Sequence, residues 1–171
     1  YLSKTLLSQT HPVINEFMAS NLNWIADNDG DYDDWIEIYN PTTYAIDLAG
    51  YYLTDDLAEL DKWQTPGGFP DSTTIECEGY LLFWADNQPW EGPNHLGFKL
   101  SIDGEQIILV STDGVTIIDS LTYQSQTTNI SQGRYPDGGE LWSFFNIPSP
   151  GSCNPSGYSG IAGSVTLSPS A

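Results

Sequence analysis

The stretch QIILVSTDGVTIIDSL, residues 106–121, contains two apolar runs joined by a short polar connection. The runs, residues 106–110 and 115–121, have the length of β-strands, and Thr112-Asp113-Gly114 stands between them. Asp-Gly between two such runs is a strong signal for a hairpin turn, because glycine takes a positive φ without a steric penalty. The stretch therefore predicts an antiparallel β-hairpin.

Short strand-like segments continue on both sides of this hairpin. Residues 35–39 alternate cleanly and stop at Asn40-Pro41, whereas Tyr80–Ala85 is almost continuously apolar, as in a central strand buried on both faces. Pro136-Asp137-Gly138-Gly139 predicts a second hairpin. Further strands are expected at residues 13–19, 45–48, 51–54, 62–64, 73–75, 98–102, 133–135 and 141–145. No window predicts a helix.

The spacing of these segments indicates an all-β fold. In residues 13–19, simple alternation places Ile14, Glu16 and Met18 on one face and Phe17 on the other. Short strands separated by frequent turns predict a β-sandwich of about nine to ten strands. The 16 glycines, 11 prolines and 13% aromatic residues suit such a fold, in which turns are many and rings fill the core.

The 171 residues suit one domain with a substantial core. We expect residues 1–12 to form an N-terminal arm or linker and residues 13–153 to form the sandwich domain. Residues 154–171, rich in Pro, Gly and Ser, are expected to be a C-terminal linker or the start of a further β module. No apolar run reaches the roughly 18 residues that a membrane-spanning helix needs, so membrane insertion is not expected.

The chain is strongly acidic. It has 23 acidic and 4 basic residues, for a formal net charge of −19. Such a charge repels phosphate backbones and anionic membrane surfaces, which argues against nucleic acid as a partner. It attracts divalent cations and basic partners, although solubility alone is a sufficient reason for it.

Taken in order, several segments resemble a lamin tail domain. They are VINEFMAS at 13–20, DDWIEIYNPT at 33–42, IDLAGYYLTDD at 46–56, GYLLFWADN at 79–87, and the stretches at 97–123 and 131–145. No single motif is diagnostic, but the ordered set is specific, and Asp34-Trp35-Ile36-Glu37 followed by Asn40-Pro41 and Leu48-Ala49-Gly50 is its most telling part. The resemblance covers roughly residues 13–150 and implies an immunoglobulin-like β-sandwich.

The resemblance implies a fold more firmly than a function. Animal lamin tails act as interaction modules at the nuclear envelope, whereas bacterial and archaeal relatives occur in large secreted or surface proteins. This chain departs from nuclear lamins because it has no coiled coil and few basic residues. The acidic composition fits the secreted branch, which implies an extracellular or cell-surface location.

The densest group of carboxylates lies between the first two expected strands. Calcium binds six to eight hard oxygens from flexible loops, and Gly30 would allow the tight turn that gathers them. The spacing does not match an EF-hand, since Tyr32 and Ile38 occupy positions that need Gly and Glu. We therefore expect either an irregular calcium site or a solvated acidic loop. The candidate ligands are Asp27, Asp29, Asp31, Asp33 and Asp34.

Trp90 and the two cysteines are further candidates. Trp90 lies in the Pro/Gly-rich loop 86–95 and would either stack on a sugar ring, where Trp63 or Trp142 could join it, or anchor the loop on the sandwich. Cys77 and Cys153 either form one disulfide or remain free thiols.

Catalytic motifs are lacking in the sequence. There is no Gly-x-Ser-x-Gly and no His-Glu-x-x-His, and the two histidines, His11 and His95, have no evident partner nearby in sequence. Glu16 and Glu37 could pair as in a glycosidase, but acidic residues are so frequent here that spacing singles out none. The sequence predicts a protein that is not an enzyme and has no cofactor apart from the calcium considered above.

Three functions remain open at this point. The first is a noncatalytic extracellular or cell-surface module that binds a protein or glycan or has a structural role. The second is a carbohydrate-binding module that uses Trp90. The third is a subunit of a surface filament or sheath that self-associates when residues 1–12 add a strand to a neighbour's sheet.

Overall fold

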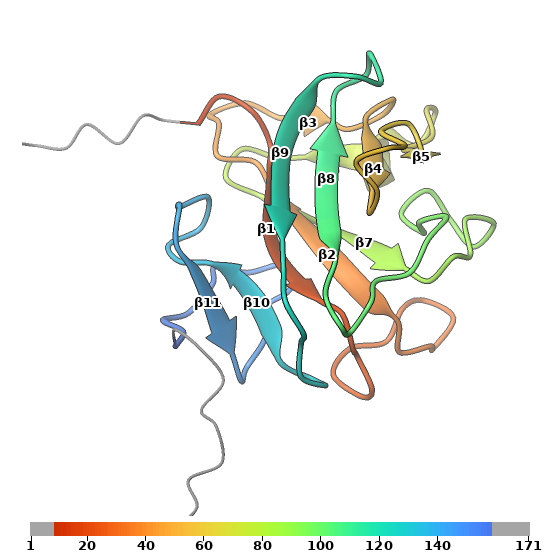
Figure 1. Cartoon of the computed structure of the whole chain (residues 1–171). Helices are drawn as coiled ribbons and strands as arrows, with labels where there is room; N and C mark the ends of the chain where they lie inside the picture. Colours follow the sequence, from red (N-terminus) through yellow and green to blue (C-terminus); the bar gives the residue numbers. More distant parts are fainter. Residues whose placement is uncertain (1–8, 159–171) are drawn as a thin grey trace, which may run out of the picture.

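The computed structural model describes residues 9–158, and the prediction of an all-β sandwich is confirmed. One sheet has five antiparallel strands in the order β11-β10-β1-β2-β7, and the other has four in the order β5-β4-β8-β9 (Figure 1). A pair, β3-β6, forms a small third sheet. The strands are β1 Val13–Met18, β2 Asp34–Tyr39, β3 Ile46–Asp47, β4 Tyr52–Thr54, β5 Trp63–Gln64, β6 Thr74–Ile75, β7 Tyr80–Ala85, β8 Gln106–Val110, β9 Ile117–Thr122, β10 Ser131–Arg134 and β11 Trp142–Phe145.

The described part therefore contains slightly more strands than the sequence predicts, and it also contains one short helix. Helix α1, Pro70–Thr73, has four residues and begins with proline, a residue that suits the first helical turn. Both predicted hairpins are present, as the antiparallel pairs β8–β9 and β10–β11. Within residues 9–158 no helix has the length and apolar character needed to cross a membrane.

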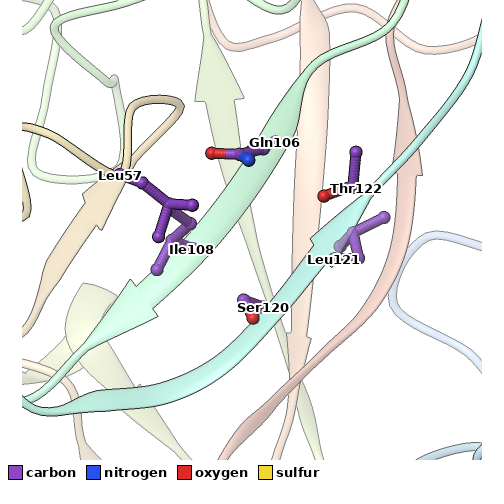
Figure 2. A pocket seen from close by; sticks show the side chains of 6 residues that line it. All are labelled: Leu57, Gln106, Ile108, Ser120, Leu121 and Thr122. Carbon is purple, nitrogen blue, oxygen red and sulfur yellow. The ribbon is translucent and has the colours of Figure 1, made fainter.

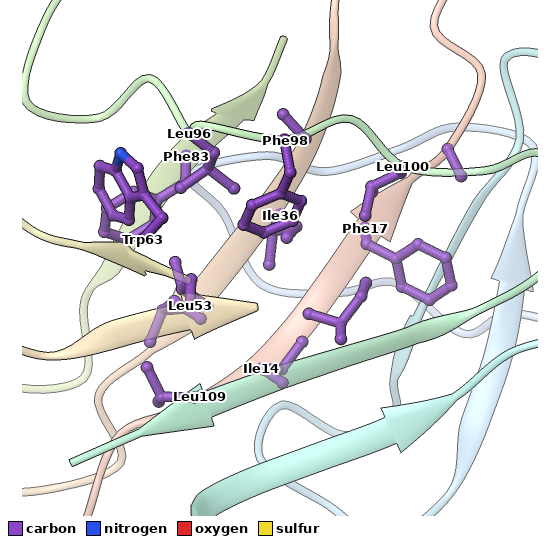
Figure 3. Packing of buried hydrophobic residues seen from close by; sticks show 14 of the residues in the cluster. Ile14, Phe17, Ile36, Leu53, Trp63, Phe83, Leu96, Phe98, Leu100 and Leu109 are labelled. Atoms are coloured by element: carbon purple, nitrogen blue, oxygen red, sulfur yellow. The ribbon is translucent and has the colours of Figure 1, made fainter. Parts of the chain in front are cut away.

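The core lies between the five-stranded and four-stranded sheets (Figure 3). Phe17 and Ile36 project from the first sheet, and Leu53 and Leu109 project from the second. All four are at most 1% exposed. Burying each such side chain contributes about 1.5–3 kcal/mol, so this layer supplies most of the driving force for the fold.

A β-bulge corrects the predicted faces of the first strand. The pairing of β1 with β2 shifts between Ile14 and Glu16, so one extra residue is inserted on β1. Ile14 and Phe17 consequently both point into the core, whereas simple alternation placed them on opposite faces. Glu16 is moved to the outer face of the sheet, where it faces Glu37 of β2.

The prediction that Tyr80–Ala85 forms a central strand is wrong, because β7 is the edge strand of the five-stranded sheet. Its free edge is covered by residues 94–98: the N–H of Trp84 donates to Asn94 at 2.8 Å, and the N–H of Leu96 donates to Trp84 at 2.8 Å. The strand expected at residues 98–102 is not formed either. Phe98 and Leu100 are buried, but the segment accepts scattered backbone hydrogen bonds from Asn87 and Gln126 and pairs as an isolated bridge between Asp86 and Lys99, so it is not a strand.

Arg134 and the C-terminal part of the chain tie the sandwich together. The Arg134 guanidinium of β10 donates two hydrogen bonds, of 3.0 and 2.9 Å, to Asp119 of β9, which belongs to the other sheet.

Contacts of the domain continue past residue 153, since Asn154 is buried and Tyr158 pairs with Phe144. Residues 1–8 of the expected arm and residues 159–171 lie outside the described part.

Candidate functional site

Two loops meet at one end of the five-stranded sheet. Asp34, the first residue of β2, pairs with Ala85, the last residue of β7. The loop that precedes Asp34 and the loop that follows Ala85 therefore leave the sheet side by side. We refer to these loops, residues 19–33 and 86–95, as the loop end of the domain.

Four side chains from the loop end come together. Asp27, Asp86, Glu91 and His95 each offer one ligand atom, and these atoms all lie within 4.8 Å of one another. We call them the Asp/Glu/His group. Asp86 and His95 are 1% and 4% exposed. Burial at this level is unusual for such polar side chains and requires them to be paired or to hold an ion.

Asp27 is fixed by its own loop. One carboxylate oxygen, Oδ1, accepts hydrogen bonds from the N–H groups of Asp29, Gly30 and Asp31 at 2.8–2.9 Å. Gly30 has a φ of +94°, which allows the turn that directs these backbone donors, rather than the carboxylates that the sequence predicts, toward Asp27. The other oxygen, Oδ2, is buried and has no hydrogen-bond partner.

The remaining three members of the group come from the loop after β7. His95 Nδ1 makes a short hydrogen bond with Asp86 Oδ2 and lies 3.7 Å from Glu91 Oε2. Gln88 holds both acids, since its N–H donates to Asp86 Oδ1 at 2.8 Å and its side chain bonds Glu91 Oε1. Glu91 Oε2, like Asp27 Oδ2, is buried without a hydrogen-bond partner.

Asp33 adds a further negative charge beside the group. Burial raises the pKa of its carboxyl, and the nearby carboxylates of Asp86 and Asp27 raise it further, while Lys99 lowers it. Its Oδ2 is also buried and unpartnered. The negative charge gathered here is therefore only partly balanced by the protein, and a cation would relieve it.

The predicted ligand set is only partly brought together. Asp27 belongs to the group and Asp33 lies near it, but Asp29 and Asp31 are exposed and point their backbone, not their carboxylates, toward Asp27. Asp34 has another role: its Oδ1 accepts the N–H of Asn21 at 3.2 Å, and burial raises its pKa to about 6.

Sequence reasoning missed Asp86, Glu91 and His95 as partners of Asp27. They lie about 60 residues further along the chain, and only the pairing of β2 with β7 brings them close. The usable signal was an Asp, a Glu and a His in one short loop directly after a strand.

Trp90 lies in the same loop and is 76% exposed. This accessibility is what stacking on a ligand requires, and it differs from an indole packed on the sandwich edge. Trp63 and Trp142 cannot join Trp90. Trp63 is 9% exposed and packs edge-on against Phe83 in the core, and Trp142 lies against the Arg134 guanidinium, 4.8 Å from its ring centre.

Glu16 and Glu37 form a different cluster on the outer face of the five-stranded sheet. Both are 0% exposed and lie directly opposite each other in the ladder. Burial raises the pKa of Glu16 and raises that of Glu37 to about 8. Because neither carboxyl reaches the surface, this pair offers no accessible acid and base to a glycan.

The C-terminal segment, residues 149–154, covers these two acids. Ser149 donates from its N–H and its hydroxyl to Glu16, and the N–H of Gly151 donates to Glu37. Asn154 donates to the backbone oxygen of Arg134 at 2.8 Å. The cluster therefore fastens the end of the domain to the sheet.

Cys77 and Cys153 are free and exposed, so the disulfide that the sequence left open is not formed in this structure. Cys77 lies in the turn between β6 and β7, and Cys153 lies in the segment that covers the buried acids.

A hollow on the outer face of β8 and β9 offers no comparable chemistry (Figure 2). Its lining contains no titratable side chain and consists of Leu57, Gln106, Ile108, Ser120, Leu121 and Thr122. We therefore regard the loop end as the candidate functional site.

Comparison with known proteins yields one match. A family model described as Lamin Tail Domain matches residues 8–125. No curated protein and no solved structure matches the chain. The matched part contains the Asp/Glu/His group and Trp90, and it ends before β10 and β11, which complete the five-stranded sheet.

Proposed function

The chain belongs to the lamin tail domain family, and from this premise we propose that it is a noncatalytic interaction or structural module of an extracellular or cell-surface protein. The net charge of −19 supports this assignment, because it disfavours binding to nucleic acid and to anionic membranes. A protein or a glycan at a cell surface is the partner that this proposal requires.

The observation that carries the proposal is the exposure of aromatic side chains on the two loops of the loop end. Trp24, Tyr32 and Trp90 are 39%, 48% and 76% exposed. Aromatic side chains supply large contact area at low conformational cost and are enriched at binding surfaces. We also propose that a divalent cation stiffens the loop end. The density of carboxylates in residues 27–34 predicts calcium as this cation.

The direct test is binding of the labelled full chain to a panel of bacterial and archaeal cell envelopes, each used intact and after protease treatment. Saturable binding supports the proposal, and protease treatment identifies the partner, because it abolishes binding to a protein and leaves binding to a glycan. Failure to bind any envelope in either form contradicts it.

Trp90 specifically supports carbohydrate binding as a second candidate. An indole that is 76% exposed presents its face to a sugar ring without any rearrangement of the core. Soluble and insoluble polysaccharides are the probes, and Trp90→Ala should abolish binding. Phe69→Ala is the matched control, since Phe69 is 50% exposed but lies before α1 and outside the loop end. No binding across a broad polysaccharide panel would exclude this candidate.

A further inference from the structure

We propose that Asp27, Asp86, Glu91 and His95 bind one divalent transition ion of the zinc class, which ties the β1–β2 loop to the loop after β7. The inference rests on the proposed function, which includes a divalent cation at the loop end, and it names that cation and its ligands. It names a different ion from the calcium expectation and shares only Asp27 with the ligands expected there.

The ligand chemistry favours a transition ion over calcium. Calcium takes six to eight oxygen ligands, whereas this group offers four side chains and one of them is an imidazole. Imidazole nitrogen together with carboxylate oxygen is a ligand set that zinc accepts in four-coordinate sites. His95 is 4% exposed and its Nδ1 lies beside both Asp86 and Glu91, so it is not a solvated loop histidine.

The geometry is close to that of a closed site. The four ligand atoms lie within 4.8 Å of one another. Ligands at zinc distances of about 2.0–2.1 Å in a tetrahedron are roughly 3.3 Å apart, so the group has to contract by a modest amount. Glu91 can supply this movement, because it lies on the loop and its side chain is 18% exposed.

The unpartnered oxygens are the independent sign of a missing ligand. Asp27 Oδ2 and Glu91 Oε2 are both buried, and neither has a hydrogen-bond partner. Buried polar atoms are almost always paired, and each unpaired one needs an explanation. Two such oxygens in one group that also contains His95 are explained together by a single bound cation.

The ion would act as a clamp. Asp27 comes from the loop before β2, whereas Asp86, Glu91 and His95 come from the loop after β7. One ion bound to all four joins the loops that carry Trp24 and Trp90. The ion would then fix where the exposed aromatic side chains lie, but it would not itself contact the partner that they bind.

The test is a thermal melt of the full chain after chelation and removal of the chelator. The background should be Cys77→Ser with Cys153→Ser, since the two exposed thiols would otherwise bind zinc themselves. Zinc at a hundredfold excess over its Kd should raise the midpoint by roughly 5–10 °C, whereas calcium and magnesium should not. Titration calorimetry should give one zinc per chain.

Two variants locate the site. Glu91→Gln should abolish the zinc response while leaving the metal-free midpoint unchanged or higher, because it removes one charge from a repulsive group. Asp29→Asn removes a charge from the same end but outside the group, so it should retain the full response. This pair remains informative even if His95→Ala fails to fold.

Each other outcome overturns the inference. A calcium-selective rise would replace the transition ion by calcium. Equal rises with zinc, calcium and magnesium, or a zinc response that Glu91→Gln retains in full, would mean diffuse binding to an acidic surface. No rise with any ion would leave the Asp86–His95 pair as a purely structural contact. In that case envelope binding that depends on Trp90 would still support the proposed function, so the two failures are distinguishable.

Discussion

Glu16 on β1 lies directly opposite Glu37 on β2, and neither side chain is exposed to solvent. Their hydrogen-bond donors are neutral groups, chiefly Ser131, Ser149, Gly151 and Asn15, and no cationic side chain is among them. Two like charges in this position would destabilise the fold, so at least one carboxyl is held in its protonated form near neutral pH.

The first prediction concerns stability against pH. Burial raises the pKa of Glu37 from 4.5 to about 8, so the folded chain retains a proton that the unfolded chain releases. The stabilisation is therefore full below about pH 4.5 and is lost as the pH rises through 8. In Glu37→Gln, which carries no titratable proton, the fall in thermal midpoint between pH 6 and pH 9 should be smaller than in the wild type.

Two other acidic side chains, Glu16 and Asp137, lie close to Glu37. Burial also raises the pKa of Glu16, which acts in the same direction, and Asp137 adds a nearby negative charge. Glu59→Gln is the control, because Glu59 is exposed and should retain the wild-type fall. A wild-type midpoint that is equal at pH 6 and pH 9 would contradict the assignment.

The second prediction concerns the link between the sheets. Arg134 is 8% exposed, and its guanidinium bonds Asp119 twice and the backbone oxygen of Ile14 once. Lysine cannot reproduce this planar arrangement, so Arg134→Lys should lower the free energy of unfolding by about 3 kcal/mol. Urea denaturation measures this loss.

The comparison for that experiment is Lys62→Gln. Lys62 forms an ion pair with Asp55, but its side chain is 28% exposed, and such pairs contribute about 0–1 kcal/mol. Equal losses in the two variants would mean that the Arg134–Asp119 contact does not hold the sheets together.

The third prediction concerns the turn that positions Asp27. Gly30 has a φ of +94°, and a Cβ added there would meet no atom within 4 Å. Gly30→Ala should therefore cost about 1–2 kcal/mol through backbone strain alone. Gly67→Ala is matched to it, since Gly67 is equally open but lacks the positive φ, and it should change the unfolding free energy by less than about 0.5 kcal/mol.

The fourth prediction separates stability from binding at Trp90. Because this side chain is 76% exposed, Trp90→Ala should leave the thermal midpoint within about 2 °C of the wild type. Phe17→Ala, which empties a fully buried position, should by contrast cost about 3–5 kcal/mol. A large fall in the midpoint of Trp90→Ala would show that the indole supports the loop and is not available to a ligand.

Local turn chemistry explains which parts of the fold are predictable from the sequence. Thr112-Asp113-Gly114 and Pro136-Asp137-Gly138-Gly139 both lie in hairpins as predicted. The bulge after Ile14 has no comparable local signal, because the extra residue is decided by packing on both faces of β1. The sequence did not indicate that β7 is an edge strand. Because residues 94–98 cover its free edge, β7 can be as apolar as a central strand.

The candidate site was only partly predictable for a similar reason. The density of acids around Asp27 was visible, but its partners are set by the pairing of Asp34 with Ala85, a contact between distant parts of the chain. In the alternating stretch 35–39, Glu37 stands between Ile36 and Ile38, which predicts only that its side chain points away from the face that these two share. Nothing local indicates that Ser149 and Gly151 return to cover that face.

The measurement that tests the central claim most directly compares the affinities of the wild type, Trp90→Ala and Phe69→Ala for bacterial and archaeal cell envelopes, the partner that the proposed function requires. If the loop end is the contact face, Trp90→Ala should weaken binding at least about tenfold, and Phe69→Ala should bind as the wild type does. Equal affinities for the wild type and Trp90→Ala, or a loss confined to Phe69→Ala, would contradict the account and place the contact face elsewhere on the sandwich.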